Sequence, residues 1–386
     1  MEFYASCPEG FEIALSNELR AMGLRQVRRL KGRVTFTGEQ TDAYRACLWS
    51  RLASRVFVVL ARFDCSTADD LYDGAYDIAW ENILAPGATI AVSARGTTDE
   101  LRNSHFSALR VKDALCDRLA EVAGRRPSVD VDDPDARIAL SVREGRVSLQ
   151  LDLSGDPLFK RLPREATRPG TAHILRPDYA ALMLEQAGWG EAIAAANASG
   201  EALALVDFSC AGGGAELEAA QILIDRAPGL LREHWGFEGW AQHDANAWNQ
   251  LVSEADARAE AGANRTATII AADADNGAAE FARRIIRKAG FARFVRIVPA
   301  GTTAILDALE RDGIVPGVPA HIALVADATE TTIKNTAALL ALASDLRTSE
   351  VFAAARLAAL TRDDMLPRAL GTAPASALNV KPVSYT

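Results

Sequence analysis

The stretch from Ala202 to Ala220 joins an apolar run, a turn rich in glycine and a run of helix-forming residues. It reads Ala202-Leu203-Ala204-Leu205-Val206, then Asp207-Phe208-Ser209-Cys210, then Ala211-Gly212-Gly213-Gly214, then Ala215-Glu216-Leu217-Glu218-Ala219-Ala220. An apolar run without alternation is typical of a strand buried on both faces, and the residues after the glycines favour a helix. Glycines bring the backbone close to a ligand, and a helix N-terminus offers unpaired N–H groups. The stretch therefore predicts the first strand, turn and helix of a nucleotide-binding α/β sheet, with an ordinary connecting turn as the alternative.

The spacing of the glycines narrows the choice of ligand. The dinucleotide fingerprint has its third glycine at the position of Leu217, and the Gly-Lys-Ser/Thr motif of nucleoside triphosphatases is absent. Asp207 ends the predicted strand just before the turn. An acid in this place suits S-adenosylmethionine, which carries an amino acid and a ribose but no phosphate, better than a pyrophosphate.

The composition is that of an ordinary soluble globular protein with two or three domains. The chain has 386 residues, of which 49% are apolar and 24% charged, and its net charge is −9. No apolar run approaches the roughly 20 residues that span a bilayer, and the N-terminus lacks the features of a signal peptide. The five cysteines form no Cys-x-x-Cys pair. We therefore expect a cytoplasmic protein with reduced thiols, no metal site and no indiscriminate coating of nucleic acid.

One basic cluster stands out against the acidic background. Residues 20 to 33 contain no acid and hold Arg20, Arg25, Arg28, Arg29, Lys31 and Arg33. The cluster could contact phosphates, with Arg28 and Arg29 as RNA-binding candidates, or it could be a solvated helix end and turn.

The pattern of the first 152 residues predicts short strands and helices in alternation. Helices are expected over 9–22, 42–49, 68–80 and 103–123, and strands over 34–37, 55–62, 89–94, 138–143 and 146–152. The pair Glu144-Gly145 between the last two strands indicates a hairpin. A polar, proline-bearing linker is predicted over 154–177.

After this linker the chain predicts a parallel sheet. Strands are expected over 202–206, 268–272, 294–298 and 321–326, with helices over 276–289 and 302–310. Such alternation places ligands at the carboxyl ends of the strands. Asp207, Asp273 and Asp327 each end a strand, so we expect them to line one cleft, although a single acid in this position can be a simple helix cap.

Several long segments resemble the THUMP-domain methyltransferases, most closely the bacterial family that methylates the exocyclic N2 of a guanine in large-subunit ribosomal RNA. The resemblance rests on Leu48-Trp49-Ser50-Arg51-Leu52-Ala53-Ser54-Arg55, Leu101-Arg102-Asn103-Ser104-His105-Phe106, Val111-Lys112-Asp113-Ala114, Leu151-Asp152-Leu153-Ser154-Gly155-Asp156, Arg226-Ala227-Pro228-Gly229-Leu230, Trp235-Gly236-Phe237 and Trp240-Ala241-Gln242-His243-Asp244. It implies an α/β fold: a Rossmann-like S-adenosylmethionine methyltransferase domain preceded by a ferredoxin-like plus THUMP α+β domain. The implied boundaries are 1–64 for the ferredoxin-like module, 65–153 for THUMP, 154–177 for the linker and 178–386 for the methyltransferase domain.

The resemblance also implies roles for single residues. The cofactor-binding candidates are Asp207, Cys210, Gly212, Gly213 and Asp273, with Asp273 accepting hydrogen bonds from the ribose. Arg102, Asn103 and Lys112 are the RNA-contact candidates in THUMP, or alternatively brace the domain's own helix. Ribosomal RNA is the implied partner, the oligomeric state is left open, and the second methyltransferase unit fused in some bacteria is not expected in this chain.

The chain departs from the family at three places in the methyltransferase domain. The family's glycine loop reads Asp-Pro-x-Cys-Gly-Ser-Gly-Thr, and its first glycine is Ala211 here. The cofactor can still fit if Ala211 has a negative φ, whereas a positive φ would disfavour alanine at this position. The acid expected for the adenine amino group is replaced by Pro299-Ala300-Gly301. The catalytic Asn-Pro-Pro-Tyr becomes Ala326-Asp327-Ala328-Thr329, followed by Glu330-Thr331.

These departures leave three hypotheses for the function. In the first, Asp327 accepts a hydrogen bond from the target amine and another residue stacks on the extruded base. In the second, slightly favoured mechanistically, the catalytic half has decayed and the chain is a non-enzymatic RNA-binding protein. In the third, it is a small-molecule methyltransferase with an accessory domain.

Overall fold

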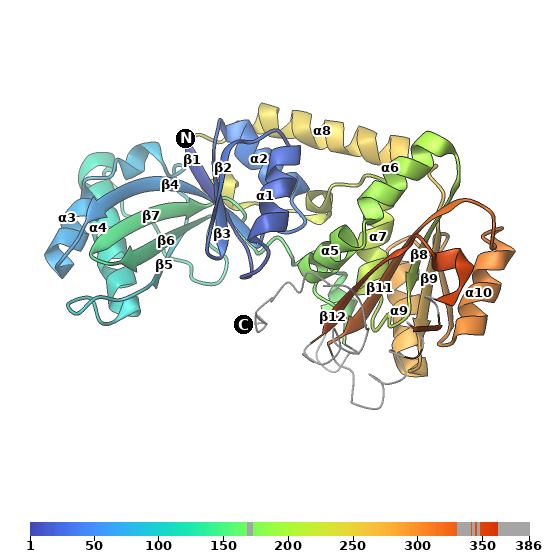
Figure 1. Ribbon diagram of the computed structural model, residues 1–386. Helices are drawn as coiled ribbons and strands as arrows, with labels where there is room; N and C mark the ends of the chain where they lie inside the picture. The colour runs from blue at the N-terminus through green and yellow to red at the C-terminus, as the bar shows by residue number, and fades with distance from the viewer. Residues whose placement is uncertain (168–172, 330–340, 342–343, 346–347, 362–386) are drawn as a thin grey trace. The chain divides into compact units, whose positions relative to one another are not determined.

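The computed structural model describes residues 1–167, 173–329, 341, 344–345 and 348–361. These residues form two compact units (Figure 1). Unit 1 comprises 1–158 and 231–253, and unit 2 comprises 159–230 and the described residues from 254 onward. The chain therefore leaves unit 2 once, contributes a segment to unit 1 and returns.

Unit 1 is built on a single seven-stranded sheet in the order β2-β3-β1-β4-β7-β6-β5. All neighbours are antiparallel except β5 and β6, which are parallel. The two expected modules share this sheet, because β4 pairs with β1 on one side and with β7 on the other. The strands are β1 Glu2–Ser6, β2 Arg25–Leu30, β3 Arg33–Thr37, β4 Arg55–Asp64, β5 Ile90–Arg95, β6 Ala136–Arg143 and β7 Arg146–Asp152.

Four helices cover one face of this sheet. They are α1 Glu12–Ala21, α2 Gln40–Trp49, α3 Ala68–Tyr76 and α4 Ser104–Ala123. The short helix η1 Trp80–Asn82 follows α3. Alternate strand residues such as Phe3, Phe36 and Leu149 are fully buried, as expected for a sheet with one covered face. The predicted hairpin is present, with positive φ angles at Glu144 and Gly145.

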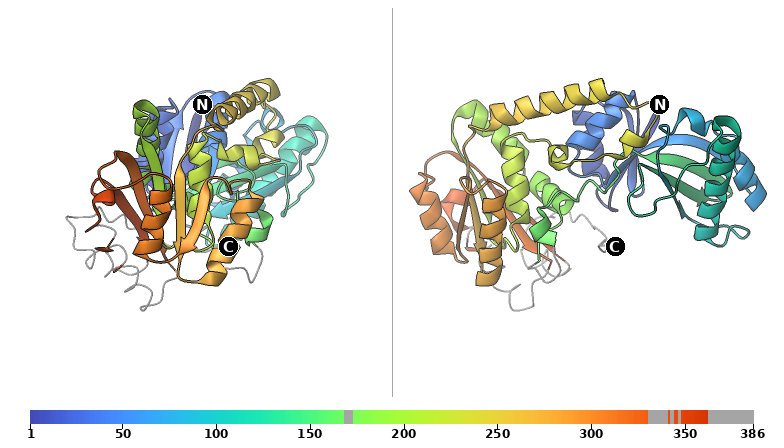
Figure 2. Two further views of the ribbon diagram at one scale, coloured as in Figure 1. Left: turned by 90° about the vertical axis from the view of Figure 1, so that its right-hand side faces the viewer. Right: turned by 180° about the vertical axis from the view of Figure 1, so that it is seen from behind.

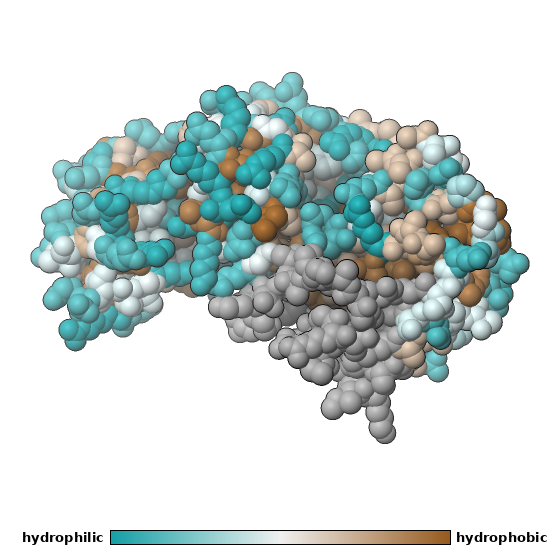
Figure 3. Space-filling model, in the orientation of Figure 1, coloured by the Kyte–Doolittle hydropathy of each residue, from teal (hydrophilic) through white to brown (hydrophobic). Residues whose placement is uncertain are grey.

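The middle of the basic cluster is a strand, which the interpretation as a helix end and turn misses, while Arg20 does end α1 and Lys31 does lie in a turn. Residues Arg25–Leu30 form β2, which pairs with β3 at the edge of the sheet. Charged residues are uncommon in strands, but an edge strand with exposed positions accommodates them. In Figure 3, hydrophilic residues dominate the visible surface of unit 1.

The segment 231–253 packs against unit 1 through backbone contacts that require glycine. It contains the end of η3 Pro228–Leu231, the short helix η4 Gly236–Gly239 and the start of α8 Ala245–Gly262. A Cβ atom on Gly236 would lie 2.4 Å from the carbonyl oxygen of Asp152. Arg232 donates to the carbonyl oxygens of Ser154 and Asp156 at 2.9 Å each, and the Tyr44 hydroxyl lies 2.7 Å from His243 Nδ1. No sequence pattern indicated this excursion.

Unit 2 contains a five-stranded parallel sheet in the order β10-β9-β8-β11-β12. The predicted parallel sheet is confirmed, and this order places the reversal of strand order between β8 and β11, where such sheets bind ligands. Figure 2 shows the strands between helices. The strands are β8 Ala202–Asp207, β9 Thr268–Asp273, β10 Val295–Pro299, β11 Ala320–Ala328 and β12 Arg356–Thr361, and the helices are η2 Arg164–Thr167, α5 Pro177–Gln186, α6 Trp189–Ser199, α7 Gly214–Leu223, α9 Asn276–Lys288, α10 Thr302–Arg311 and η5 Glu350–Phe352.

Two apolar cores lie on opposite faces of this sheet. One contains side chains of α5, α6, α7 and α9, including Trp189 and Ile285. The other contains side chains of α10, including Ile305 and Leu309. Since both faces are covered, the strands need apolar residues throughout, which is why β8 shows no alternation.

Candidate cofactor and reaction site

The turn after β8 is held by the carboxylate of Asp273 at the end of β9. Its Oδ2 accepts a hydrogen bond from the Ala211 backbone N–H at 2.8 Å, and its Oδ1 accepts one from the Asp275 N–H at 2.8 Å. The Cys210 N–H also donates to the Ala272 carbonyl at 3.1 Å. Asp273 therefore fixes the turn that was predicted to carry the cofactor.

Ala211 adopts the conformation that the sequence made unfavourable for alanine. Its φ is +45°, in the left-handed region where a Cβ atom costs roughly 1 to 2 kcal/mol. The condition under which Ala211 would match the family's glycine, a negative φ, is not met. The hydrogen bond from its N–H to Asp273 holds it in this strained conformation.

The predicted glycines are required by contacts within the protein itself. A Cβ atom on Gly212 would lie 2.5 Å from the carbonyl oxygen of His173, and Gly213 has a φ of +85° at the start of α7. The segment that begins at His173 therefore packs directly on the glycine turn. The glycines are needed for this contact whether or not a ligand lies on the other side.

The three strand-end acids gather around the Phe208–Ala211 turn, although the sequence predicted that all three would line one cleft. The Asp207 side chain accepts from the Ser209 N–H at 2.9 Å, and the Ser209 hydroxyl donates to the Asp327 carbonyl at 2.6 Å. Asp207 is fully buried, Asp327 is 5% exposed and Asp273 is partly exposed. Asp207 therefore lies beneath the site instead of lining its surface.

Glu216, which the sequence did not single out, is a second carboxyl buried beside Asp207. It lies in the first turn of α7 and is fully buried, and its carboxyl shares a hydrogen bond with the buried carboxyl of Asp207. Burial raises the pKa of Glu216 well above its usual range, and the charge of Asp207 raises it further. Burial likewise raises the pKa of Asp207. A glutamate in a first helical turn is ordinarily exposed and stabilised by the helix dipole, so no sequence signal reveals this one.

The predicted thiol Cys210 is buried in the same region. Burial and the neighbouring carboxyls raise its pKa far above the ordinary range of a thiol. Cys210 is therefore a protonated packing residue and not a nucleophile.

Asp327 is already engaged by two side chains that the sequence did not point to. Its Oδ1 accepts from the Thr329 N–H at 3.0 Å and from the Thr329 hydroxyl at 2.6 Å, and its Oδ2 lies 3.1 Å from His173 Nε2. The His173 side chain is 34% exposed while that of Asp327 is 3% exposed. Asp327 thus orients an accessible imidazole and a hydroxyl. Glu330 and Thr331 of the predicted loop lie outside the described residues.

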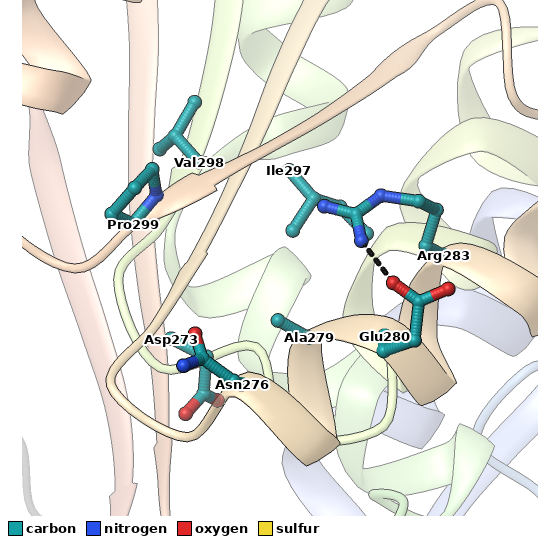
Figure 4. Close-up of a pocket in the computed structure, with 8 residues that line it drawn as sticks. All are labelled: Asp273, Asn276, Ala279, Glu280, Arg283, Ile297, Val298 and Pro299. Carbon is teal, nitrogen blue, oxygen red and sulfur yellow. Dashed lines mark hydrogen bonds and ion pairs between the residues drawn. The ribbon is translucent and has the colours of Figure 1, made fainter.

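A pocket of about 300 Å³ lies between the end of β9, α9 and β10 (Figure 4). This volume is at the lower end of the range for small-molecule sites. Glu280 and Arg283 pair with each other in its wall. The lining residues are Asp273, Asn276, Ala279, Glu280, Arg283, Ile297, Val298 and Pro299.

The pocket fits the nucleoside half of S-adenosylmethionine. A carboxylate has about four acceptor sites, so Asp273 can accept from ribose hydroxyls beside its two backbone bonds. Ile297 and Val298 supply apolar surface for a base. Pro299 stands where the resemblance places an adenine-binding acid, so a charged hydrogen bond to adenine is not available at that position.

The RNA-contact candidates fall into two groups that the structure does not bring together. Arg28 and Arg29 lie on β2 at one edge of the seven-stranded sheet, while α4 packs on β5 at the other edge. Asn103 caps α4, because its Oδ1 accepts from the N–H groups of His105 at 2.9 Å and Phe106 at 3.2 Å. Lys112 pairs with Asp113 at 2.6 Å, and Arg102 donates to the Asp99 carbonyl.

Two kinds of feature are absent from the described residues. No helix there is long and apolar enough to cross a membrane. No group of three or more His, Cys, Asp or Glu side chains there could hold a metal ion.

The fold and the site together define a Rossmann-like methyltransferase unit joined to an α+β unit of the ferredoxin-like and THUMP type. Three known families match the chain in this order: the RlmL ferredoxin-like domain over residues 2–57, the THUMP domain over 65–152 and the RMKL-like methyltransferase domain over 164–360. The chain belongs to the RMKL-like methyltransferase family, and this family identifies S-adenosylmethionine as the cofactor of the fold.

Curated relatives carry the description "Ribosomal RNA large subunit methyltransferase K/L". The protein from Syntrophotalea carbinolica is 39% identical over 324 residues, which is 83% of this chain and 44% of the relative. The protein from Allochromatium vinosum is 41% identical over 290 residues, which is 75% of this chain and 38% of the relative. The chain therefore spans less than half the length of these relatives.

Solved structures share the fold. A predicted N6-adenine-specific DNA methylase from Listeria monocytogenes superposes with a TM-score of 0.75 at 22% identity, covering 96% of this chain and 91% of its own. A second structure, of a protein complexed with SAH, has a TM-score of 0.71 at 24% identity and covers 96% of this chain and 92% of its own. At these identities the likeness concerns the fold alone.

Proposed function

We propose that this chain transfers a methyl group from S-adenosylmethionine to an exocyclic amine, guanine N2, of large-subunit ribosomal RNA. The observation that carries the proposal is Asp273, which fixes the glycine turn and lines the pocket between the end of β9, α9 and β10. The family membership and the description of the curated relatives support the same activity. Ribosomal RNA as substrate would place the protein in the cytoplasm.

The proposed site has two parts, one around Asp273 for the cofactor and one around Asp327 for the target amine. S-adenosylmethionine supplies an activated methyl group on a sulfonium. Asp273 would hold the ribose, and the pocket beside it would hold the base. Asp207 and Glu216 lie buried beneath the turn, where partial ionisation would favour a cationic ligand above them.

Asp327 is the proposed acceptor for the target amine, and its partners decide how it can act. With Thr329 on Oδ1 and His173 on Oδ2, an amine would contact the remaining lone pairs of the carboxylate or the groups that Asp327 orients. The exposed imidazole of His173 could take the proton that the amine loses after transfer, because histidine titrates near neutral pH. The two rigid prolines and the aromatic ring of the family loop have no counterpart among Asp327, Ala328 and Thr329.

A second function, RNA binding without catalysis, is favoured by Ala211. A strained alanine replaces glycine at the turn that must meet the cofactor, and a rigid loop with a stacking ring is missing. A catalytically decayed homologue would retain the fold and the RNA interaction.

Isothermal titration calorimetry with S-adenosylmethionine tests the cofactor site. We expect micromolar binding to the wild type and none to Asp273→Ala, with circular dichroism to confirm that the variant is folded. Glu310→Ala, which changes an exposed acid at the end of α10 outside this pocket, should bind nearly as well as the wild type. Absence of binding to the wild type, together with binding to Ala211→Gly, would favour the decayed homologue.

Methylation of deproteinised large-subunit RNA, followed by nucleoside mass spectrometry, tests the reaction itself. We expect N2-methylguanosine with the wild type and a loss of at least tenfold in rate with Asp327→Asn. A methyl group on another atom would contradict the proposed amine, and no methylation despite cofactor binding would contradict the proposed activity on this RNA.

A further inference from the structure

The register of the seven-stranded sheet divides its residues between two faces. Residues paired across neighbouring strands point to the same side. The row Thr35, Tyr4, Phe57, Asp152 and Arg137 therefore lies on one face. The adjacent row Phe36, Phe3, Val58, Leu151 and Ile138 lies on the other, beneath the helices.

The face without the helices carries at least one arginine on every strand except β1. We call it the arginine face, and define it by its nine arginines: Arg25 and Arg28 on β2, Arg33 on β3, Arg55 and Arg62 on β4, Arg95 on β5, Arg137 and Arg143 on β6, and Arg146 on β7. Three acids share it, Glu2, Asp64 and Asp152, so the strand positions sum to 9 − 3 = +6. The whole protein carries −9, which makes this concentration of positive charge exceptional within the chain.

The positive charge is accessible. Arg25, Arg28, Arg62, Arg95, Arg143 and Arg146 are exposed. The three acids each pair with one arginine, as Glu2 with Arg62, Asp152 with Arg55 and Asp64 with Arg146. Among the described residues, Arg25, Arg28 and Arg95 form no ion pair.

The side chains between the arginines are mostly small and polar, and a few are aromatic. Tyr4 stacks on Phe57 with ring centroids 4.7 Å apart, and Arg33 lies 5.4 Å from the centre of the Tyr4 ring. Hydroxyl groups that can reach phosphate or ribose oxygens come from Ser6, Thr35, Thr37, Ser93, Ser141 and Ser148.

We propose that the arginine face binds a single-stranded segment of the RNA substrate. The inference rests on the proposed function in taking RNA as the polyanion. Single strands are commonly held on open sheet faces by positive charge and stacking. The sheet from β2 to β5 has six strand spacings, or about 29 Å, which accommodates several nucleotides.

The choice of residue argues for RNA over a generic anionic surface. Every basic residue of the face is arginine and none is lysine. A guanidinium binds phosphate through two hydrogen bonds and stacks on bases, whereas attraction to an anionic membrane is served equally well by lysine.

The arginine face also connects the two groups of RNA candidates that lie at opposite edges. Arg28 pairs with Thr35 and belongs to the face, while Arg29 pairs with Val34 and points to the helix side. The strand β5 with Arg95 lies beside α4. Asn103 has a capping role, so the inference predicts that Arg95 contributes more to RNA binding than Asn103.

Fluorescence anisotropy with a labelled single-stranded RNA of about 12 nucleotides and mixed sequence tests the inference on the full chain. The variant Arg25→Gln/Arg28→Gln/Arg95→Gln should bind at least tenfold more weakly. Its salt dependence, log Kd against log salt, should be shallower by about 2, because each phosphate contact to a single strand contributes roughly 0.7.

A matched variant removes the same charge from the helix side of unit 1. Arg45→Gln/Arg125→Gln/Arg126→Gln should bind within about threefold of the wild type. Equal weakening by both variants would show that only net charge matters and would overturn the inference. So would unchanged binding by the arginine-face variant, or no binding of the oligonucleotide by the wild type.

Cross-linking locates the RNA independently of affinity. A 4-thiouridine-containing oligonucleotide should cross-link to peptides of β1 and β3, which include Tyr4 and Thr35, and cross-links confined to α4 would contradict the inference. The outcome is separable from the proposed function. RNA binding at this face without methylation would leave the inference standing and overturn the activity, whereas undiminished methylation by the arginine-face variant at limiting RNA would overturn the inference alone.

Discussion

The two sheets of this protein treat charge in opposite ways. The seven-stranded sheet displays nine arginines on a face whose charged ends largely reach water. The five-stranded sheet has carboxyls at the carboxyl ends of its strands and in the first turn of α7, and two of them, Asp207 and Glu216, are fully buried. Repulsion among exposed arginines is weak because water screens it, and together these positive charges attract a polyanion. Ionising neighbouring carboxyls in the protein interior costs so much free energy that they keep their protons instead.

The two sheets differ in what their charged residues affect. Removing arginines of the seven-stranded sheet should weaken RNA binding and leave the free energy of unfolding almost unchanged. Removing buried carboxyls of unit 2 should raise or lower the free energy of unfolding, depending on the partners of each carboxyl. Calorimetry can follow the second effect. Trp189, which is buried in unit 2 and donates to the Ala219 carbonyl at 3.1 Å, reports on that unit by fluorescence.

The largest effect is expected at Glu218, the paired carboxyl of α7. It accepts from Arg161 Nε at 2.7 Å, with both side chains at most 2% exposed. Glu218→Gln should destabilise unit 2 by about 3 to 5 kcal/mol, because it removes the charge that neutralises a buried guanidinium. Urea unfolding followed by Trp189 fluorescence measures this, and the exposed Glu280→Gln should stay within about 0.5 kcal/mol. A change at Glu218 as small as that of the control would contradict the distinction between paired and exposed acids.

The opposite sign is expected two residues earlier, at Glu216. Glu216→Leu should stabilise unit 2 by about 2 kcal/mol at neutral pH, because it removes a fully buried carboxyl that lies beside a second acid, Asp207. The raised pKa means that the folded state holds a proton that the unfolded state releases above about pH 4.3. Wild-type stability should therefore fall as pH rises from about 4.3 toward 8, and the variant should show a shallower slope, because the raised pKa of the buried Asp207 still contributes. A wild type with equal stability at both ends of the range, or a destabilised variant, would show that the hydrogen bond between Glu216 and Asp207 outweighs the cost of burying the two acids.

A smaller gain is expected at Ala211. Ala211→Gly relieves the positive φ and should stabilise unit 2 by about 0.5 to 1 kcal/mol, after allowance for the added freedom of the unfolded chain. The thermal midpoint of unit 2 by calorimetry is the measurement, with Ala215→Gly in α7 as a control that should destabilise by a similar amount. Loss of stability in Ala211→Gly would show that the left-handed turn is not strained.

The smallest effect on folding is expected on the arginine face. The Arg25→Gln/Arg28→Gln/Arg95→Gln variant should unfold within about 0.5 kcal/mol of the wild type, because exposed charges without ion pairs contribute little. Urea unfolding of unit 1, followed by far-ultraviolet circular dichroism, checks this. Marked destabilisation would mean that these arginines support the sheet and would remove the contrast between the two regions.

Sequence patterns predicted the parts of the fold that depend on local periodicity. The uniform apolar runs of β8, β9 and β11 and the hairpin at Glu144-Gly145 follow from burial on both faces and from turn chemistry. The interpretation of the basic cluster failed because β2 is defined by its pairing with β3, and its arginines carry no strand signal of their own. The excursion 231–253 was missed for the same reason, since contacts between distant residues reveal it, such as those of Gly236 with Asp152 and of Arg232 with Ser154.

The candidate site shows the same limit. The sequence alone predicts that Asp207, Asp273 and Asp327 lie near one another, because the carboxyl ends of parallel strands meet on the same side of a sheet. His173 could not be added to them, because it lies 154 residues before Asp327 and reaches it only through the packing of its backbone on Gly212.

By itself the sequence determined that this chain has a parallel α/β half with acids at its strand ends and a family likeness to methyltransferases that act on RNA. Only the tertiary structure decided that Ala211 is left-handed, that Asp327 is engaged by His173 and Thr329, and that arginines from six strands share one face. Periodicity is a property of neighbours along the chain, whereas a residue's burial, partners and face depend on strands and turns that meet only after folding.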